Sequence, residues 1–334
     1  MGIRNKAFDA GVLKSREFDV PTICIGNISV GGTGKTPHTE YIIRLLKEKY
    51  SIAVLSRGYG RKSKGYVKAC STSAMEQIGD EPFQIKEKFN DIDVAVCEKR
   101  VKGIEELLAG NDSLQAILLD DAFQHRYVKA GLYVLLIDSN RPLWNDNVMP
   151  FGRLRESIAA VERADIVIFT KCKGISDEQK TKYRSFIKEA NDVPVYFSTV
   201  RYGKTYSLFN TTDSRVGIDG EESILLVTGI ANPLPLKKEL EERGAKVELM
   251  QYADHYNFTN ADLDDIAQRF LKGGHTRIAT TEKDATRIKQ HAEALQSIRD
   301  KFFVVPIEVE FLDGEEKLFN QNIYNYVTEN SRNS

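Results

Sequence analysis

The segment PTICIGNISVGGTGKTPHTEYIIRLLKEKY, residues 21–50, indicates the fold class of this chain most clearly. Its first six residues form a short apolar run typical of a buried strand, and its last part, EYIIRLLKEKY, has the apolar spacing of an amphipathic helix. Between them, SVGGTGKT closely follows the phosphate-loop pattern G-x-x-x-x-G-K-[ST], with Ser29 in place of the first glycine. This order predicts a nucleotide-phosphate site where a strand passes into a helix.

The residues of this loop have distinct expected roles. Its glycines let backbone N–H groups wrap the phosphates, Lys35 neutralises the β- and γ-oxygens, and the Thr36 hydroxyl reaches Mg²⁺. Pro37 can start a helix whose amino end favours anions. We therefore expect Mg-ATP to be bound, and its γ-phosphoryl group transferred, at Ser29, Val30, Gly31, Gly32, Thr33, Gly34, Lys35 and Thr36.

The rest of the chain predicts two α/β parts. From about residue 20 to residue 200, short apolar runs alternate with amphipathic stretches, as in a mainly parallel sheet covered by helices on both faces. We expect residues 1–200 to form a three-layer α/β/α P-loop domain, residues 201–223 a linker, and residues 224–334 a smaller C-terminal α/β domain. Nucleotide and substrate would meet in the cleft between the two domains.

Composition excludes several classes of protein. Lys and Arg number 47 and Asp and Glu 48, so the charge balance gives no sign of a nucleic-acid partner. The four cysteines are far apart, which favours small buried residues over a disulfide frame or a zinc site. No signal peptide and no run of about 20 apolar residues is visible, so we expect a reduced cytoplasmic setting.

Acidic residues end another apolar run. AILLDD, residues 116–121, reads as a buried strand that ends in two carboxylates, the usual place for a metal-organising acid beside a phosphate loop. We expect Asp120 and Asp121 to organise Mg²⁺.

Three loops carry further candidates, each with an ordinary alternative. SRGYGRKSKG, residues 56–65, offers Arg57, Tyr59 and Arg61 to an anionic substrate, or is a solvated basic loop. The acids of GDEP, residues 79–82, either act in catalysis or cap a helix. The arginines of FGRLRES, residues 151–157, either brace the transferring phosphate or form surface ion pairs.

Eight motifs in order closely resemble the tetraacyldisaccharide 4'-kinases, the lipid A 4'-kinases of the P-loop NTPase superfamily. They are GNISVGGTGKTP, LSRGYGR, GDEP, DDAFQHR, MPFGRLRE, VTGIANP, DHYNF and TTEKD, and the resemblance extends from residue 20 to residue 287. The resemblance implies transfer of the ATP γ-phosphate to the 4'-hydroxyl of a tetraacylated glucosamine disaccharide 1-phosphate, giving lipid IVA for lipopolysaccharide. It also implies a peripheral enzyme at the cytoplasmic face of the inner membrane; we infer no obligate protein partner. The TTEKD stretch has no predicted role.

The resemblance also implies residue roles. Asp80 of GDEP looks like the base that takes the proton from the sugar hydroxyl, and His255 of DHYNF looks like its partner across the cleft, able to orient the acid and tune its pKa. Asp120, Asp121 and Glu156 look like metal-organising acids. Arg100 and Arg155 look like phosphate or transition-state contacts, whose loss would lower turnover more than stability.

The amino-terminal segment departs from the family pattern. Family members usually begin with a hydrophobic membrane-associating helix, whereas this chain opens with MGIRNKAFDAGVLKSREFDVP and has no predicted transmembrane helix. Residues 2–15 are compatible with a weak amphipathic helix at the membrane interface, or with a helix docked on the protein surface. The residues concerned are Ile3, Phe8, Val12 and Leu13, with Arg4, Lys6 and Lys14.

Three other functions are alternatives to the kinase. A guanine-nucleotide switch protein is suggested by IFTKCKG, residues 168–174, but Lys173 stands where the base-reading Asp of TKxD belongs. A non-enzymatic ATP-binding factor would need no acceptor base, and a small-molecule sugar kinase would act without lipid.

Overall fold

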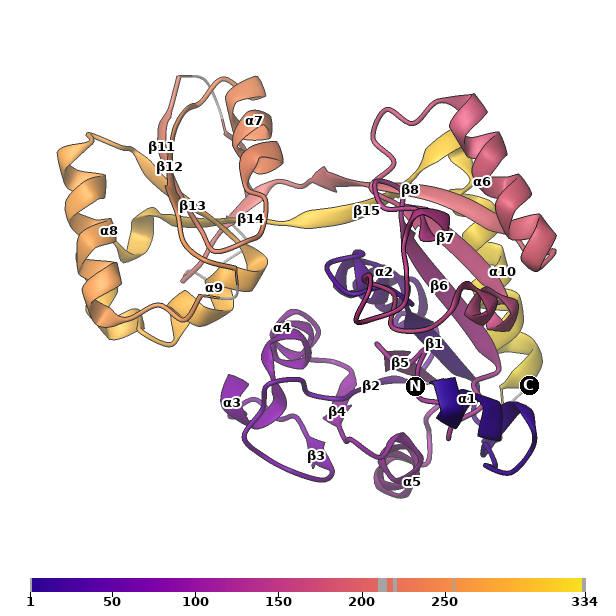
Figure 1. The fold of residues 1–334 in the computed structure, drawn as a ribbon. Helices are drawn as coiled ribbons and strands as arrows, with labels where there is room; N and C mark the ends of the chain where they lie inside the picture. Colours follow the sequence, from indigo (N-terminus) through magenta and orange to yellow (C-terminus); the bar gives the residue numbers. More distant parts are fainter. Residues whose placement is uncertain (1, 210–214, 219–220, 255, 332–334) are drawn as a thin grey trace. The chain divides into compact units, whose positions relative to one another are not determined.

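The chain forms two compact units in the computed structural model, which describes residues 2–209, 215–218, 221–254 and 256–331. The first unit is Met1–Val200 with Val309–Ser334, and the second is Arg201–Glu308. Figure 1 shows that each unit combines helices with a β-sheet. The expected α/β class, with a second and smaller α/β part, is confirmed.

A mainly parallel sheet is the centre of the first unit. Its nine strands have the order β15-β8-β7-β6-β1-β5-β2-β4-β3. Every pairing from β8 to β4 is parallel, so the carboxyl ends of β6, β1 and β5 lie next to one another at one edge. The strands are β1 (Thr22–Gly26), β2 (Ile52–Ser56), β3 (Val67–Lys68), β4 (Asp93–Val96), β5 (Ala116–Asp120), β6 (Leu132–Asp138), β7 (Ile166–Thr170), β8 (Val195–Tyr202) and β15 (Ile307–Phe311).

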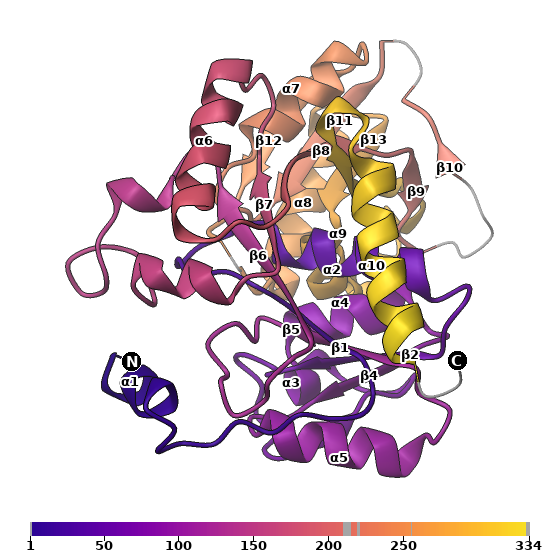
Figure 2. The same cartoon turned by 90° about the vertical axis from the view of Figure 1, so that its right-hand side faces the viewer.

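Helices cover both faces of this sheet, as expected for three layers. Alternate residues of a strand point to opposite faces, and Cys24 of β1 accordingly joins one apolar cluster while Ile23 and Ile25 join the other. Helices α5 and α6 pack on the face that contains Cys24. Helices α2, α4 and α10 pack on the opposite face; α10 is yellow in Figure 2. The helices are α1 (Gly2–Asp9), α2 (Lys35–Leu46), α3 (Met75–Ile78), α4 (Asp80–Lys88), α5 (Arg100–Gly110), α6 (Asp177–Ala190) and α10 (Glu316–Asn330), with 3-10 turns η1 (Leu143–Asn145), η2 (Ile158–Arg163) and η5 (Leu312–Gly314).

The end of the chain differs from the sequence-based division. Residues 224–334 were expected to form one C-terminal domain, but β15 joins the first sheet and α10 buries Phe319, Ile323 and Val327 in the core of the first unit. These three residues are four positions apart, the spacing of one face of a helix. This spacing predicts that the helix has a buried face, but it does not indicate which sheet covers that face. The first unit is therefore made of two separate chain segments.

The second unit has its own six-stranded sheet, in the order β10-β9-β14-β13-β11-β12. The expected linker, residues 201–223, contributes β9 and β10 to this sheet and is not merely a connection. Pairings among β11, β12, β13 and β14 are parallel. The elements are β9 (Thr205–Ser207), β10 (Arg215–Val216), β11 (Ser223–Thr228), α7 (Leu234–Glu242), β12 (Lys246–Gln251), α8 (Asn260–Lys272), β13 (Arg277–Thr281), α9 (Glu282–Lys289), η3 (Ala292–Leu295), η4 (Arg299–Lys301) and β14 (Phe302–Val305).

Asp284 gives the TTEKD stretch a structural role. Its side chain is fully buried, and Oδ2 accepts hydrogen bonds from Thr281 Oγ1 at 2.7 Å, Thr228 Oγ1 at 2.8 Å and the Gly229 amide at 3.1 Å. The carboxylate thus joins the start of α9 to the end of β11. A buried carboxylate with several donors of this kind holds two loops together.

Helix α1 is docked on the first unit in this structure. Phe8 is buried and meets the edge of Tyr127, with ring centroids 5.0 Å apart. Arg4 Nη2 donates to the Gln124 carbonyl at 2.7 Å, and Arg126 Nη1 donates to the Asn5 carbonyl at 3.0 Å. Of the two alternatives for this segment, the structure shows the docked surface helix. No helix in the described part of the chain is both long and apolar enough to span a membrane.

Candidate active site

The phosphate loop runs between β1 and α2 at the carboxyl edge of the first sheet. Gly31 and Gly34 have φ values of 104° and 85°, a region that glycine adopts without steric cost. Ser29, at the position of the usual first glycine, is not among the residues with positive φ and forms an antiparallel bridge with Leu154. Serine is therefore compatible with this loop, and the departure from the motif has a backbone explanation.

Neighbouring segments hold the loop in place. Asn27 Nδ2 donates to Thr33 Oγ1 at 2.7 Å, and Thr170 Oγ1, at the end of β7, donates to the Thr33 carbonyl at 3.0 Å. The Val30 amide donates to the Arg153 carbonyl at 2.8 Å. Helix α2 begins at Lys35, two residues before the proline that was expected to start it. These contacts fix the loop between β1 and α2.

His38 supports the loop from within α2 and was missed by the sequence reasoning. It is buried, its Nδ1 lies 2.7 Å from the Gly34 carbonyl, and its Nε2 lies 3.0 Å from Ser198 Oγ. Burial lowers the pKa of His38 to about 4, with the Gly34 hydrogen bond opposing. The ring is therefore neutral near pH 7.

His38 predicts a loss of stability in mild acid. The unfolded chain takes up a proton near pH 6.5 and the folded chain only near pH 4, so protons favour unfolding as the pH falls through this window. We expect the free energy of unfolding to fall by about 3 kcal/mol more between pH 7 and pH 4 in wild type than in His38→Gln. Urea unfolding at several pH values measures this difference, and parallel pH profiles for the two proteins would contradict it.

The two acids at the end of β5 occupy different environments. β5 pairs with β1 in register Ile25 to Asp120, which brings both acids beside the phosphate loop. Asp120 is buried and accepts from Thr39 Oγ1 at 3.1 Å and Ser56 Oγ at 3.4 Å. Asp121, with a positive φ of 44°, meets Lys35 Nζ at 3.7 Å. Lys35 of the loop and these acids therefore form one cluster.

The Asp120 carboxyl has a raised pKa. Burial and, after it, the negative charges of Glu81 and Asp121 raise the pKa of Asp120 to about 7, while Lys35 opposes this rise. The effect of Glu81 shows that the start of α4, with the GDEP motif, lies close enough to act on the end of β5. A cation near these acids would favour the ionised form of Asp120.

Arg155 and Arg100 have different surroundings. Arg155 Nη1 bonds to both oxygens of Asp121, at 3.0 and 3.1 Å, so it lies at the phosphate-loop cluster. Arg100 is buried, and its guanidinium donates to the carbonyls of Cys97 at 2.7 Å and Asp120 at 3.4 Å. Burial lowers the pKa of Arg100 to about 10, so the group stays charged at neutral pH. In this structure Arg100 supports the end of β5; its expected phosphate contact stays a prediction.

Glu156 has contacts other than those of a metal-organising acid. Its two oxygens accept from Arg163 Nη2 at 3.2 and 3.0 Å, and Oε2 also accepts from Asn5 Nδ2 at 2.6 Å. These partners belong to η2 and α1, and the carboxylate is buried among them. In the described part of the chain, Glu156 is bonded to Arg163 and Asn5, and not to Asp120 or Asp121. Within the described ranges, no three His, Cys, Asp or Glu residues form a ready metal cluster.

The residues expected to act on the lipid acceptor also differ in their surroundings. Gly79, with φ of 90°, packs against the basic loop: a Cβ there would lie 2.9 Å from the Tyr59 carbonyl. This contact places Asp80, the first residue of α4, beside that loop. Arg57 and Tyr59 are exposed, whereas Arg61 is engaged, donating to Glu98 at 2.5 Å and to the Gly65 carbonyl at 2.6 Å. His255 lies outside the described residues.

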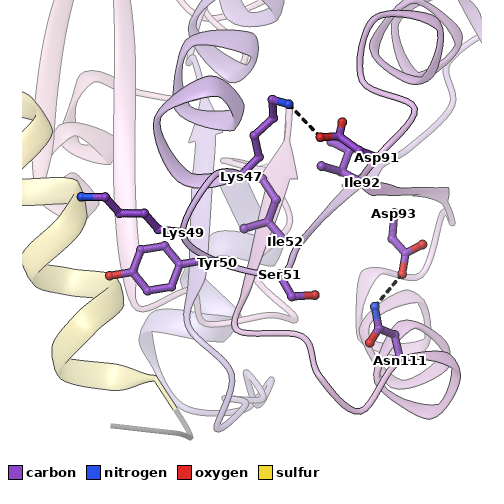
Figure 3. A pocket seen from close by; sticks show the side chains of 9 residues that line it. All are labelled: Lys47, Lys49, Tyr50, Ser51, Ile52, Asp91, Ile92, Asp93 and Asn111. Carbon is purple, nitrogen blue, oxygen red and sulfur yellow. Dashed lines mark hydrogen bonds and ion pairs between the residues drawn. The ribbon is translucent and has the colours of Figure 1, made fainter.

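A pocket of about 360 Å³ lies elsewhere on the first unit (Figure 3). It opens at the starts of β2 and β4, the edge of the sheet opposite to the phosphate loop. Polar side chains of its lining are paired with one another: Lys47 Nζ meets Asp91 at 2.7 Å, and Asn111 Nδ2 donates to Asp93 at 3.0 Å. Ligand sites of parallel sheets lie at the carboxyl ends of the strands, so we do not assign the active site here.

The phosphate loop, the acids at the end of the neighbouring strand and the mainly parallel sheet define a P-loop nucleotide-binding protein equipped for phosphoryl transfer. The comparison with family models is more specific. The model described as "Tetraacyldisaccharide-1-P 4'-kinase" matches residues 1–328, and the chain belongs to this family. The resemblance inferred from the eight motifs is confirmed.

Relatives and a solved structure agree with this assignment. Proteins named tetraacyldisaccharide 4'-kinase from Bacteroides thetaiotaomicron and Bacteroides fragilis are 47% and 49% identical; the alignments cover 99% and 100% of this chain and 91% of each relative. A crystal structure of LpxK from Aquifex aeolicus in complex with ATP has a TM-score of 0.75 and 28% identity, covering 98% of this chain and 94% of that one. Membership of a kinase family favours the kinase over the switch protein and the non-enzymatic factor.

Proposed function

We propose that this chain transfers the γ-phosphoryl group of ATP to the 4'-hydroxyl of tetraacyldisaccharide 1-phosphate, forming lipid IVA for lipid A biosynthesis. The observation that carries the proposal is the cluster of Lys35, Asp121 and Arg155 beside an ordered phosphate loop, in a chain of the 4'-kinase family. Two cations next to the loop suit the charge that develops on a transferring phosphoryl group.

Three residues fit Mg²⁺. Thr36, Asp120 and Asp121 supply hydroxyl and carboxylate oxygens beside the phosphate loop, the hard donors that Mg²⁺ uses together with nucleotide phosphates. We propose that these residues hold the ion with ATP. When bound, Mg²⁺ neutralises phosphate charge and orients the γ-phosphoryl group. Glu156 is left out of this set because Arg163 and Asn5 already engage it.

Asp80 is the proposed general base. As the acceptor oxygen forms its bond to the γ-phosphorus, the hydroxyl proton passes to the Asp80 carboxylate and the bond to the β-phosphate oxygen breaks, leaving ADP. Its place at the start of α4, next to the Arg57 and Tyr59 loop, supports this role. We further propose that His255 of the second unit takes part in catalysis, and that Arg57 and Tyr59 bind the anionic lipid.

The acceptor can be tested directly. We expect ATP-dependent phosphorylation of tetraacyldisaccharide 1-phosphate in detergent micelles, and none of the deacylated disaccharide phosphate in water. Equal rates on both acceptors would favour the small-molecule sugar kinase, and a preference for GTP over ATP would favour the switch protein.

We also propose a peripheral position at the cytoplasmic face of the inner membrane. The loop of residues 148–151 ends in exposed apolar side chains, with Phe151 90% exposed. The same loop is fixed from both sides, because the Met149 amide donates to the Leu154 carbonyl and the Leu154 amide to the Asn147 carbonyl, both at 2.9 Å. It continues into Arg153, whose carbonyl binds the phosphate loop. An apolar tip held beside the active site suits a lipid substrate and the membrane surface that contains it.

This position predicts lipid binding that depends on the tip. Phe151→Ser combined with Met149→Ser should lower binding to phosphatidylethanolamine and phosphatidylglycerol vesicles by at least about tenfold, because burying one such side chain contributes about 1.5–3 kcal/mol. Vesicle flotation measures the bound fraction. Leu318→Ser, which removes an exposed leucine from α10, is the control and should have no effect. Unchanged flotation of the double variant would contradict the proposal.

A further inference from the structure

The phosphate loop has a charged group on its other side as well. In the sheet, β1 lies between β5, which carries Asp120 and Asp121, and β6, which ends in Asp138. Asp138 is buried, and its Oδ2 meets Lys171 Nζ at 2.7 Å and Arg141 Nη2 at 3.2 Å. One carboxylate thus holds two cations, which leaves one net positive charge at this edge of the loop.

Arg141 lies directly against the phosphate loop. A Cβ on Gly31 would be 3.2 Å from Arg141 Nη1, 3.7 Å from Nη2 and 3.8 Å from Cζ, so the guanidinium rests on the bare Cα of this glycine. A side chain at residue 31 would crowd the guanidinium and, at φ of 104°, strain the backbone. Nη1, the atom nearest to Gly31, has no hydrogen-bond acceptor among the residues described, and the side chain remains 41% exposed.

The other cation is engaged more fully. Lys171 adopts a positive φ of 61°, a conformation that non-glycine residues seldom hold, and its ammonium makes the shorter of the two contacts with Asp138. Thr170, the preceding residue, binds the phosphate loop through the Thr33 carbonyl. Asp138 is therefore neutralised by Lys171, which leaves the Arg141 guanidinium available to an anion at Gly31.

We propose that Arg141 contacts the phosphate oxygens of bound ATP, with Asp138 holding its guanidinium against Gly31. A phosphate loop binds anions through the amides around its glycines, so a ligand there lies within reach of Arg141. The planar guanidinium fork matches phosphate oxygens. The phosphates would then lie between Arg155 on the β5 side and Arg141 on the β6 side. The inference rests on the proposed function only in taking ATP as the nucleotide.

Nucleotide binding without lipid tests this inference. We expect Arg141→Gln to weaken the binding of fluorescent mant-ATP, with Mg²⁺ present, by about 10- to 100-fold, because charge-assisted hydrogen bonds contribute about 1.5–3 kcal/mol. Arg141→Lys keeps the charge without the fork and should fall between Arg141→Gln and wild type. Arg44→Gln removes a guanidinium of similar exposure, paired with Glu40 on α2, and should stay within twofold of wild type.

Two results would overturn the inference: mant-ATP binding by a folded Arg141→Gln variant within twofold of wild type, or an equal loss in Arg44→Gln. If Arg141→Gln did not fold, Arg141→Lys would decide, because ATP binding equal to wild type would exclude a fork-dependent contact. Failure of the proposed lipid phosphorylation is a separate outcome, since it is measured on the wild type and leaves this binding assay unaffected.

Discussion

Lys35→Ala should lower kcat/KM for lipid phosphorylation by at least about 10³-fold, because Lys35 is the phosphate-loop cation and lies 3.7 Å from Asp121 at the end of β5. Its removal takes a positive charge from the β- and γ-oxygens and leaves Asp121 with Arg155 alone. Steady-state kinetics with ATP and micellar lipid measure the effect.

Lys47→Ala provides the matched control for this experiment. Lys35 begins helix α2, and Lys47 directly follows the last residue of this helix. Lys47 pairs with Asp91, far from the strand ends that carry Asp120 and Asp121. Its replacement should change kcat/KM by less than about twofold, since exposed ion pairs contribute little. If Lys35→Ala retained more than a tenth of wild-type activity, the phosphate loop would not be the catalytic centre.

Asp80→Asn is expected to lower kcat by about 10²- to 10⁴-fold, the range typical of a lost general base, while ATP binding stays within about twofold of wild type. The amide has nearly the same shape as the carboxylate but cannot accept the hydroxyl proton. The split between kcat and nucleotide affinity separates this role from a purely structural one.

Glu76→Gln is the control for Asp80. Glu76 lies in α3, the helix just before α4, and forms an exposed ion pair with Lys62. Its loss should leave kcat unchanged. A wild-type rate for Asp80→Asn would exclude Asp80 as the base.

The parts of the fold and site that follow from local patterns could be predicted from the sequence. The phosphate loop is contiguous, and AILLDD places two acids at the end of a strand, so their positions needed no tertiary information. The structure confirms that Asp121 lies beside Lys35. The α/β class could also be predicted from local patterns, because apolar runs alternate with amphipathic stretches along the chain.

Contacts between distant segments could not be predicted in this way. The resemblance to the family assigned Glu156 to the metal site, yet its side chain bonds to Arg163 in η2 and to Asn5 in α1, contacts that the sequence alone does not reveal. Arg61 sits in a basic loop but is taken up by Glu98 on another segment. Helix α10 packs on the first sheet because its apolar residues meet the hydrophobic face of that sheet. The amphipathic pattern of α10 predicts a buried helix face, but it does not identify the sheet that covers it.

Arg141 and His38 were missed for different reasons. The run LYVLLID, residues 132–138, ends in an acid much as AILLDD does, so the same rule applied to it would have drawn attention to Asp138 and to Arg141 three residues later. Only the strand order, with β6 next to β1, shows that they adjoin the phosphate loop. His38 gives no such signal, because its contact with Ser198 joins residues 160 positions apart.

Lipid kinase activity can be measured directly by incubating the wild-type protein with γ-labelled ATP, Mg²⁺ and tetraacyldisaccharide 1-phosphate in micelles, and by locating the label on the lipid. We expect labelled lipid with the phosphate on the 4'-oxygen, and none with Lys35→Ala or Asp80→Asn. A folded, ATP-binding wild-type protein that leaves the lipid unlabelled, or labels another position, would contradict this expectation.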